Sequence, residues 1–130
     1  MYKIVLTNLD DEIRSELGEY ATLGQATDAM LGYAAAKIGE ILDSHKSDDY
    51  LDDALEDIKN ETYLRVDETD ENGEINWDGG SELLVYQDCD DYGPLAFGRS
   101  DPYILYYLYT KDGIRTYKYR INTGKFEDNQ

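Results

Sequence analysis

Residues 103–121, YILYYLYTKDGIRTYKYRI, decide the fold, because they predict two antiparallel strands joined by a tight turn. Successive side chains of a β-strand point to opposite faces, and Asp112-Gly113 signals a two-residue hairpin turn between the two strands. Such a turn pairs Lys111 with Ile114, Tyr109 with Thr116 and Tyr107 with Lys118. We expect one face to belong to the core: Ile104, Tyr106, Leu108, Tyr117, Tyr119 and Ile121. We expect the other face to be exposed or half exposed: Leu105, Tyr107, Tyr109, Thr116, Lys118 and Arg120.

Three more strands are expected between residues 63 and 87. Residues 63–66 and 74–77 flank Asn72-Gly73, the dipeptide that most strongly predicts a hairpin turn. Residues 82–87 form the third, with Leu84 and Tyr86 on one face and Leu83 and Val85 on the other, and residues 88–102 are expected to form a polar loop. We expect residues 126–130 to fray, because chain ends are rarely ordered unless other elements tie them down.

The N-terminal segment begins with a predicted strand at residues 2–7, in which Tyr2, Ile4 and Leu6 share one face. Residues 12–20 fit two interpretations. Their apolar residues have helical spacing and follow acids suited to a first helical turn, but the stretch also fits a return strand after a turn at residues 8–11. We favour the return strand, because a lone opening strand needs a partner.

A long helix is expected from Thr22 to about Asp43. Thr22 and Gln25 have the spacing of a capping box, in which two free backbone N–H groups are satisfied by side chains. One stripe of this helix faces the core: Leu23, Met30, Ala34, Ile38 and Ile41. A second stripe is made of small residues: Gly24, Gly32, Ala35 and Gly39. We favour close packing of these small residues against the protein's own sheet, with a contact between two protomers of a homodimer as the alternative.

Ser47 is expected to cap a second helix over residues 48–60, with its apolar stripe on Leu51, Ala54, Leu55 and Ile58. The predicted fold is therefore α+β, an antiparallel β-sheet with two helices packed on it. The whole chain, 1–130, is expected to form a single domain. Its parts are a strand or hairpin at 2–20, two helices at 22–60, β-hairpins at 62–121 and a tail at 122–130.

The second predicted helix carries two rows of carboxylates on its solvent side. One row is Asp48, Asp52 and Glu56, and the other is Asp49, Asp53 and Asp57. Neighbours at i, i+4 lie about 5–6 Å apart, and like charges there are mildly destabilising. The rows are either a solvated helix face or a mimic of nucleic-acid phosphates. The hairpin acids Asp67, Glu68, Asp70 and Glu71 are candidates to extend them.

The charge balance narrows the classes of partner. Twenty-nine Asp and Glu stand against twelve Lys and Arg in 130 residues, a formal net charge of −17. Such a chain repels phosphates, so we expect a basic protein partner and no direct contact with nucleic acid or an anionic membrane. No apolar run is long enough to cross a membrane. A lone cysteine, Cys89, cannot form an internal disulfide and makes the cytoplasm the default compartment.

No pattern in the sequence predicts a catalytic or metal site. One cysteine and one histidine, His45, are too few for a zinc site of the usual composition. Residues 68–79 match an EF-hand calcium loop at five positions, but Gly79 stands where the bidentate glutamate belongs, so a hairpin is favoured. Residues 88–91 are acidic enough to hold a hard cation, but a solvated loop is favoured. We expect no enzyme activity, no cofactor and no metal.

The acidic composition and the carboxylate rows resemble the DNA-mimic inhibitors of restriction enzymes and CRISPR effectors that phages and mobile elements carry. The resemblance implies a non-enzymatic inhibitor that occupies the basic nucleic-acid-binding groove of a host-defence nuclease or another DNA-binding protein, in the host cytoplasm. An immunity protein against a nuclease toxin is one alternative. A structural or adaptor protein whose acidity only serves solubility is the other. Tyr107 and Tyr109 are candidates for a second contact, because tyrosine is enriched at interfaces.

Overall fold

The computed structural model describes residues 1–7, 14–45, 52–86, 103–121 and 123–128. Its elements in chain order are β1 (Tyr2–Thr7), β2 (Arg14–Tyr20), α1 (Leu23–Ser44), α2 (Asp52–Glu61), β3 (Leu64–Thr69), β4 (Ile75–Tyr86), β5 (Tyr103–Thr110), β6 (Gly113–Arg120) and β7 (Lys125–Asp128). Every pair of neighbouring strands is antiparallel. The α+β class with two helices on an antiparallel sheet is therefore confirmed.

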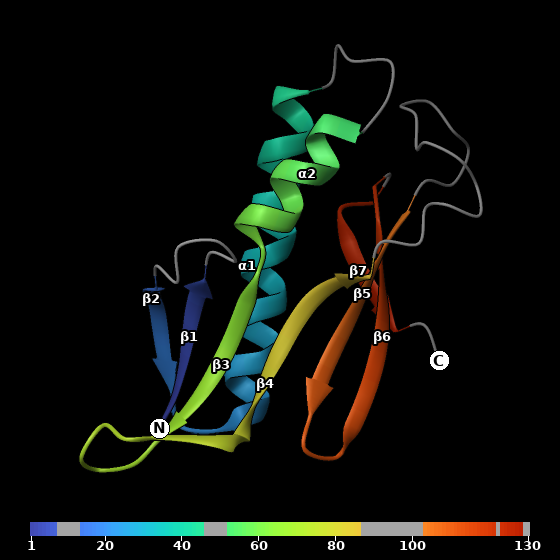
Figure 1. Ribbon diagram of the computed structural model, residues 1–130. Coiled ribbons are helices and arrows are strands. Elements are labelled where there is room, and N and C mark those ends of the chain that lie inside the picture. Colours follow the sequence, from blue (N-terminus) through green and yellow to red (C-terminus); the bar gives the residue numbers. More distant parts are fainter. Residues whose placement is uncertain (8–13, 46–51, 87–102, 122, 129–130) are drawn as a thin grey trace.

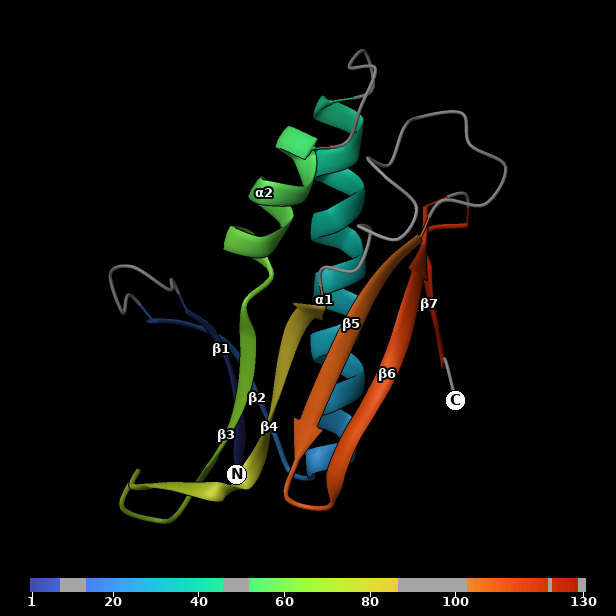
Figure 2. The same ribbon diagram turned by 45° about the vertical axis from the view of Figure 1, so that its right-hand side comes forward.

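The seven strands form one sheet in the order β2-β1-β3-β4-β5-β6-β7. Helix α1 lies on one face of this sheet, and α2 lies beside the C-terminal part of α1 (Figures 1 and 2). The sheet curves so strongly that α1 contacts β1, β2 and β3 on one side and β7 on the other. One face of the sheet thus packs on α1, and no element that the structure describes covers the opposite face, which we call the open face.

The long helix begins as the sequence predicts. The Thr22 side chain accepts a hydrogen bond from the Gln25 backbone N–H at 3.1 Å. The core stripe is confirmed at Met30, Ala34, Ile38 and Ile41. Leu23 is half-buried, and Ala26 and Leu42 are buried as well. The prediction that the glycines pack against the sheet is wrong. A Cβ atom built on Gly24, Gly32 or Gly39 meets nothing within 4 Å, because these residues face solvent.

Helix α2 packs on α1 through Ala54 and Ile58, both completely buried. The helix leads into Thr62, whose hydroxyl donates to the Ile58 carbonyl at 2.5 Å and lies 3.0 Å from the Tyr106 hydroxyl. This buried contact ties the end of α2 to the middle of β5. The predicted first residues of this helix, including Ser47 and Leu51, lie outside the described residues.

The return strand at the N-terminus is confirmed, because β2 pairs with β1 along its length. The two strands predicted at 74–77 and 82–87 are joined in the structure as one long strand, β4. Val66 pairs with Ser81 and Glu68 pairs with Asn76, so residues 77–80 together lie opposite Asp67. This wide bulge bends β4 sharply (Figure 1).

Glycine is required at the bend for steric reasons. A Cβ atom on Gly80 would lie 1.9 Å from the Val66 carbonyl oxygen, which belongs to the backbone and cannot move aside. A Cβ atom on Gly79 would meet the end of the flexible Glu68 side chain, so the steric requirement applies to Gly80. The backbone of β4 therefore approaches β3 more closely than any residue with a side chain allows.

The faces of the C-terminal hairpin are confirmed, but its register is not the predicted one. Tyr109 pairs with Ile114, Tyr107 with Thr116 and Leu105 with Lys118. The turn lies at Lys111 and Asp112, and Gly113 follows it with a φ of 135°, as the glycine after a type I turn often does. The shift by two residues leaves every side chain on its expected face, with Ile104, Tyr106, Leu108 and Tyr119 buried.

The prediction that residues 126–130 fray is wrong for residues 126–128, which are the ones that the structure describes. Gly124 has a φ of 69° and donates its backbone N–H to the Arg120 carbonyl at 2.8 Å, which turns the chain back. β7 then pairs with β6. Phe126 packs edge-on against Tyr106 and Tyr119, with ring centroids 5.2 and 5.3 Å apart. This aromatic packing ties down the end of the chain.

Candidate protein-binding surface

The exposed side of α2 is acidic. Asp53, Glu56 and Asp57 are all exposed. Glu56 lies opposite the buried Ala54 and Ile58, and Asp57 lies at the edge of the helix, where it contacts His45. The structure therefore places three of the six predicted row residues on one exposed surface. Asp48 and Asp49 lie outside the described residues, and Asp52 is described only in its backbone, as the first residue of the helix.

Helix α1 adds two exposed carboxylates, Glu40 and Asp43, in the part of the helix that lies beside α2. The sequence analysis did not select them. They occupy the polar positions of the helix, opposite the core stripe, and only the packing of α2 on α1 brings them to the same end of the molecule. We call these five residues the acidic end: Glu40, Asp43, Asp53, Glu56 and Asp57.

Among the residues of α1 and α2, few positive charges offset this surface. The two helices together contain eight acidic residues and two lysines, a net charge of −6. Lys37 lies 3.7 Å from Glu40 and 3.9 Å from Glu61, so it links the two helices. His45 lies 3.0 Å from Asp57 through its Nε2 atom. All three contacts are at the surface, where ion pairs contribute about 0–1 kcal/mol, so they orient side chains more than they stabilise the fold.

The hairpin acids do not continue the acidic end. The β3–β4 turn lies at the opposite end of the molecule from α2 (Figure 1). Asp67 is 3% exposed and accepts a hydrogen bond from Arg65 Nε at 2.8 Å. Asp70 accepts from the backbone N–H groups of Asn72 and Glu74 at 2.8 and 2.9 Å. Of the four predicted hairpin residues, Glu68 is half-buried and Glu71 is exposed.

Asp67 and Asp70 therefore have structural roles. Asp67 is held inside the sheet face by Arg65, and Asp70 organises the turn. The turn itself is the Asn72-Gly73 hairpin, with Gly73 at a φ of 79°, and the strands on both sides confirm the hairpin interpretation of residues 68–79.

Tyr107 and Tyr109 lie on the open face, with their rings edge-on at 5.8 Å between centroids. Lys118 Nζ lies 4.5 Å above the Tyr103 ring on the same face. This face is on the other side of the sheet from α1, so the two tyrosines are not continuous with the acidic end. The charge differs as well, because the described residues from Tyr103 to Asp128 contain five bases and three acids.

Within the described residues, no group of three or more His, Cys, Asp or Glu side chains has the arrangement of a metal site. The three aspartates at residues 88–91 lie outside that part of the chain. No helix among the described residues is both long and apolar enough to cross a membrane.

The acidic end is thus an exposed carboxylate surface without a catalytic arrangement among the described residues, and its chemistry is that of a docking surface for cations. Comparison of the chain with protein-family models, with curated proteins and with solved structures finds no match.

Proposed function

We propose that this protein is a non-enzymatic inhibitor that binds the basic nucleic-acid-binding groove of a host-defence nuclease or another DNA-binding protein. The observation that carries the proposal is the gathering of five exposed carboxylates at the acidic end, with few bases beside them. Carboxylates in this arrangement attract a lysine- and arginine-rich groove at long range and form charge-assisted hydrogen bonds at short range.

The dimensions favour mimicry of one strand over mimicry of a duplex. Helix α2 has ten residues and is about 15 Å long. Over 15 Å of axis, a DNA duplex carries about nine negative charges and a single strand about four. Three exposed carboxylates on α2, with Glu40 and Asp43 beside them, match the density of one strand. The acidic end therefore fits a groove that holds a single strand or one edge of a duplex.

The test compares two sets of charge-neutralising substitutions. Asp53→Asn, Glu56→Gln and Glu40→Gln remove three charges from the acidic end. Glu19→Gln, Glu71→Gln and Glu74→Gln remove three exposed charges from the other end of the molecule and serve as the matched control. Both sets change the net charge equally, so a general effect of charge on solubility or long-range attraction appears in both.

We expect the wild-type chain to capture a basic nucleic-acid-binding protein from a bacterial lysate. The acidic-end variant should bind that protein about tenfold more weakly, and the deficit should shrink at high salt. The control variant should bind as the wild type does. Equal losses in the two variants would contradict a localised contact, and no loss in either would favour a protein whose acidity serves solubility alone.

A further inference from the structure

The open face carries an apolar surface over β4, β5 and β6. Successive side chains of a strand point to opposite faces, so the residues of β5 that alternate with the buried Tyr106 and Leu108 lie on the open face. The register places Tyr107 between Leu84 of β4 and Thr116 of β6. No element among the described residues covers this surface. We call it the tyrosine face, and its members are Leu84, Tyr103, Leu105, Tyr107, Tyr109 and Ile114.

The members of the tyrosine face are half-buried or exposed. Ile114 is 56% exposed and is one of three large hydrophobic residues that are exposed in the described part of the chain. The rings of Tyr107 and Tyr109 contact each other edge-on at 5.8 Å. Tyrosine offers a large contact area at a low cost in side-chain entropy, and its hydroxyl forms hydrogen bonds at the rim of a contact. An aromatic and aliphatic surface of this kind is typical of protein–protein contacts.

Basic residues border one end of the tyrosine face. Lys118 and Arg120 of β6 lie opposite members of the face on β5, and Lys125 of β7 lies opposite Arg120. The one acid on this side of β6 and β7 is Glu127, which accepts a hydrogen bond from Arg120 Nε at 2.6 Å. Three bases and one acid give this end, near Tyr103, a net charge of +2 in a chain whose net charge is −17. A partner that docks here would place carboxylates beside the bases.

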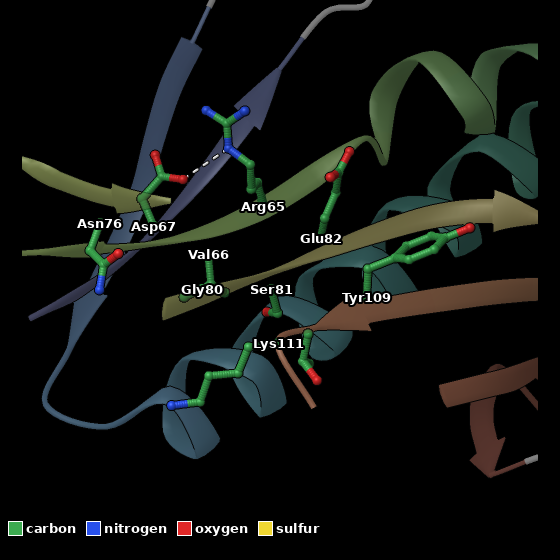
Figure 3. A pocket seen from close by; sticks show the side chains of 10 residues that line it. Arg65, Val66, Asp67, Asn76, Gly80, Ser81, Glu82, Tyr109 and Lys111 are labelled. Carbon is green, nitrogen blue, oxygen red and sulfur yellow. Dashed lines mark hydrogen bonds and ion pairs between the residues drawn. The ribbon is translucent and has the colours of Figure 1, made fainter. Parts of the chain in front are cut away.

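The opposite end of the tyrosine face is neutral. A polar cavity of about 340 Å³ borders Tyr109 there, at the bend of β4 (Figure 3). Arg65 and Lys111 balance Asp67 and Glu82 among the residues that line it. A docked chain therefore gains no net attraction at this end, and the bases at the Tyr103 end decide which charge it must carry.

The dimensions of the tyrosine face fit one α-helix. Tyr103 and Tyr109 are six residues apart on β5, which corresponds to about 20 Å at 3.3 Å per residue. The face spans three adjacent strands, and at about 4.8 Å per strand the outer two lie about 10 Å apart. An α-helix with its side chains is about 10–12 Å wide, and about 13 of its residues extend over 20 Å. Since α1 covers the other face of the sheet, a helix here would complete a three-layer packing.

Single-stranded nucleic acid fits the tyrosine face less well than a helix does. Bases stack on open aromatic rings, but Lys118 Nζ lies 4.5 Å from the centre of the Tyr103 ring. Half of the six members of the face are aliphatic and offer no ring for stacking. The net charge of −17 also repels a polyphosphate more strongly than a peptide with a few carboxylates.

We propose that the tyrosine face docks an amphipathic α-helix of a partner protein. The apolar side of this helix packs on Leu105, Tyr107 and Ile114, and carboxylates at one end of it pair with Lys118 and Lys125. The tyrosine face is not continuous with the acidic end, so the inference does not depend on the function proposed above.

Selection from a library of displayed random peptides, each about 16 residues long, tests the proposal with the full chain as the target. We expect the chain to enrich peptides whose apolar residues recur at three- and four-residue spacing and whose charged residues are mainly Asp and Glu. Tyr107→Ala should no longer enrich these peptides. Leu17→Ala removes an exposed apolar side chain from β2 and is the matched control, which should enrich the same peptides as the wild type.

An enriched peptide is then titrated into the ¹⁵N-labelled chain and followed by NMR. We expect saturable shifts in the backbone amide signals of Leu105, Tyr107 and Thr116. Tyr107→Ala should weaken binding about tenfold, because it removes the ring at the centre of the contact. Lys118→Gln should also weaken binding, and its deficit should shrink at high salt. If Tyr107→Ala does not fold, Lys118→Gln takes its place in both experiments, since it removes only a charge.

The proposal is overturned if no peptide is enriched by the wild type and lost with Tyr107→Ala, or if the lost peptides are basic. It is also overturned if a short oligothymidylate shifts the same amide signals and the enriched peptide does not, because the face would then bind nucleic acid. Basic peptides that bind the acidic end are retained by Tyr107→Ala, so failure of the proposed function and failure of this inference are distinguishable.

Discussion

The exposed glycines of α1 yield a sharp prediction about stability. Gly32 and Gly39 lie in the interior of a 22-residue helix, and a Cβ atom at either position meets nothing within 4 Å. Alanine therefore fits without a clash, and it loses less backbone entropy on folding than glycine does. The double substitution Gly32→Ala and Gly39→Ala should stabilise the fold.

The magnitude follows from helix propensity. Each glycine costs about 0.8–1.0 kcal/mol relative to alanine in a helix interior, so the double variant should gain about 2 kcal/mol. The unfolding entropy is about 2.1 cal/mol/K per residue, or about 270 cal/mol/K for this chain, so the gain corresponds to a rise in Tm of about 7 °C. Thermal unfolding followed by circular dichroism measures it.

Ala36→Gly is the matched control, because Ala36 is exposed on the same helix. It should lower Tm by about 3 to 4 °C. A fall in Tm for the double alanine variant would refute the reasoning. If that fall came with a concentration-dependent Tm of the wild type, it would show that the small-residue stripe is a contact between two protomers.

Three further predictions concern the sheet. Gly80→Ala should destabilise the fold by about 1–3 kcal/mol, measured by urea denaturation, because its Cβ would lie 1.9 Å from the Val66 carbonyl oxygen; an unchanged midpoint would contradict the close approach at the bend. Phe126→Ala should cost about 2 kcal/mol in the same assay, since it removes the ring that packs on Tyr106 and Tyr119; no loss would mean that β7 does not hold the chain end. Burial raises the pKa of Tyr106 above its ordinary value of 10.0, so the folded state keeps a proton that the unfolded state releases. The free energy of unfolding should therefore be constant below about pH 10 and fall by up to about 1.4 kcal/mol per pH unit above it. Tyr106→Phe should reduce this slope. If the variant leaves the slope unchanged, other groups cause the effect.

The parts of the fold that depend on local patterns were predictable. Period-two alternation places Tyr106 and Tyr119 on the buried face whichever way the hairpin is shifted by two residues, so the face survived an error in the register. The error arose because Gly113 follows the turn and does not form its second residue. The Thr22 cap and the core stripe of α1 are equally local.

The parts that depend on tertiary packing were not predictable from the sequence. Gly79 and Gly80 suggest a break between two strands, and only the curvature of the sheet makes them a bend within β4. Phe126 looks like part of a fraying tail until its packing against Tyr106 is known. Local composition alone does not distinguish a bend within a strand from a break between two strands, or a packed chain end from a frayed one.

The candidate site was predicted in part. The polar side of the second helix indicated Asp53, Glu56 and Asp57, and these residues are exposed as expected. Glu40 and Asp43 join them only because α2 packs on α1. The hairpin acids have the same residue types, but Asp67 and Glu68 lie in the second half of β3, and Asp70 and Glu71 follow it. β3 leads away from α2 over about 20 Å at 3.3 Å per residue.

Competition with DNA tests the central claim most directly. The affinity of the chain for its proposed basic partner is measured with increasing concentrations of DNA that the same partner binds. If the acidic end occupies the nucleic-acid groove, the apparent Kd rises in proportion to the DNA concentration, and no complex of all three molecules forms. An unchanged Kd, or a ternary complex that contains the chain, its partner and the DNA, would contradict the account.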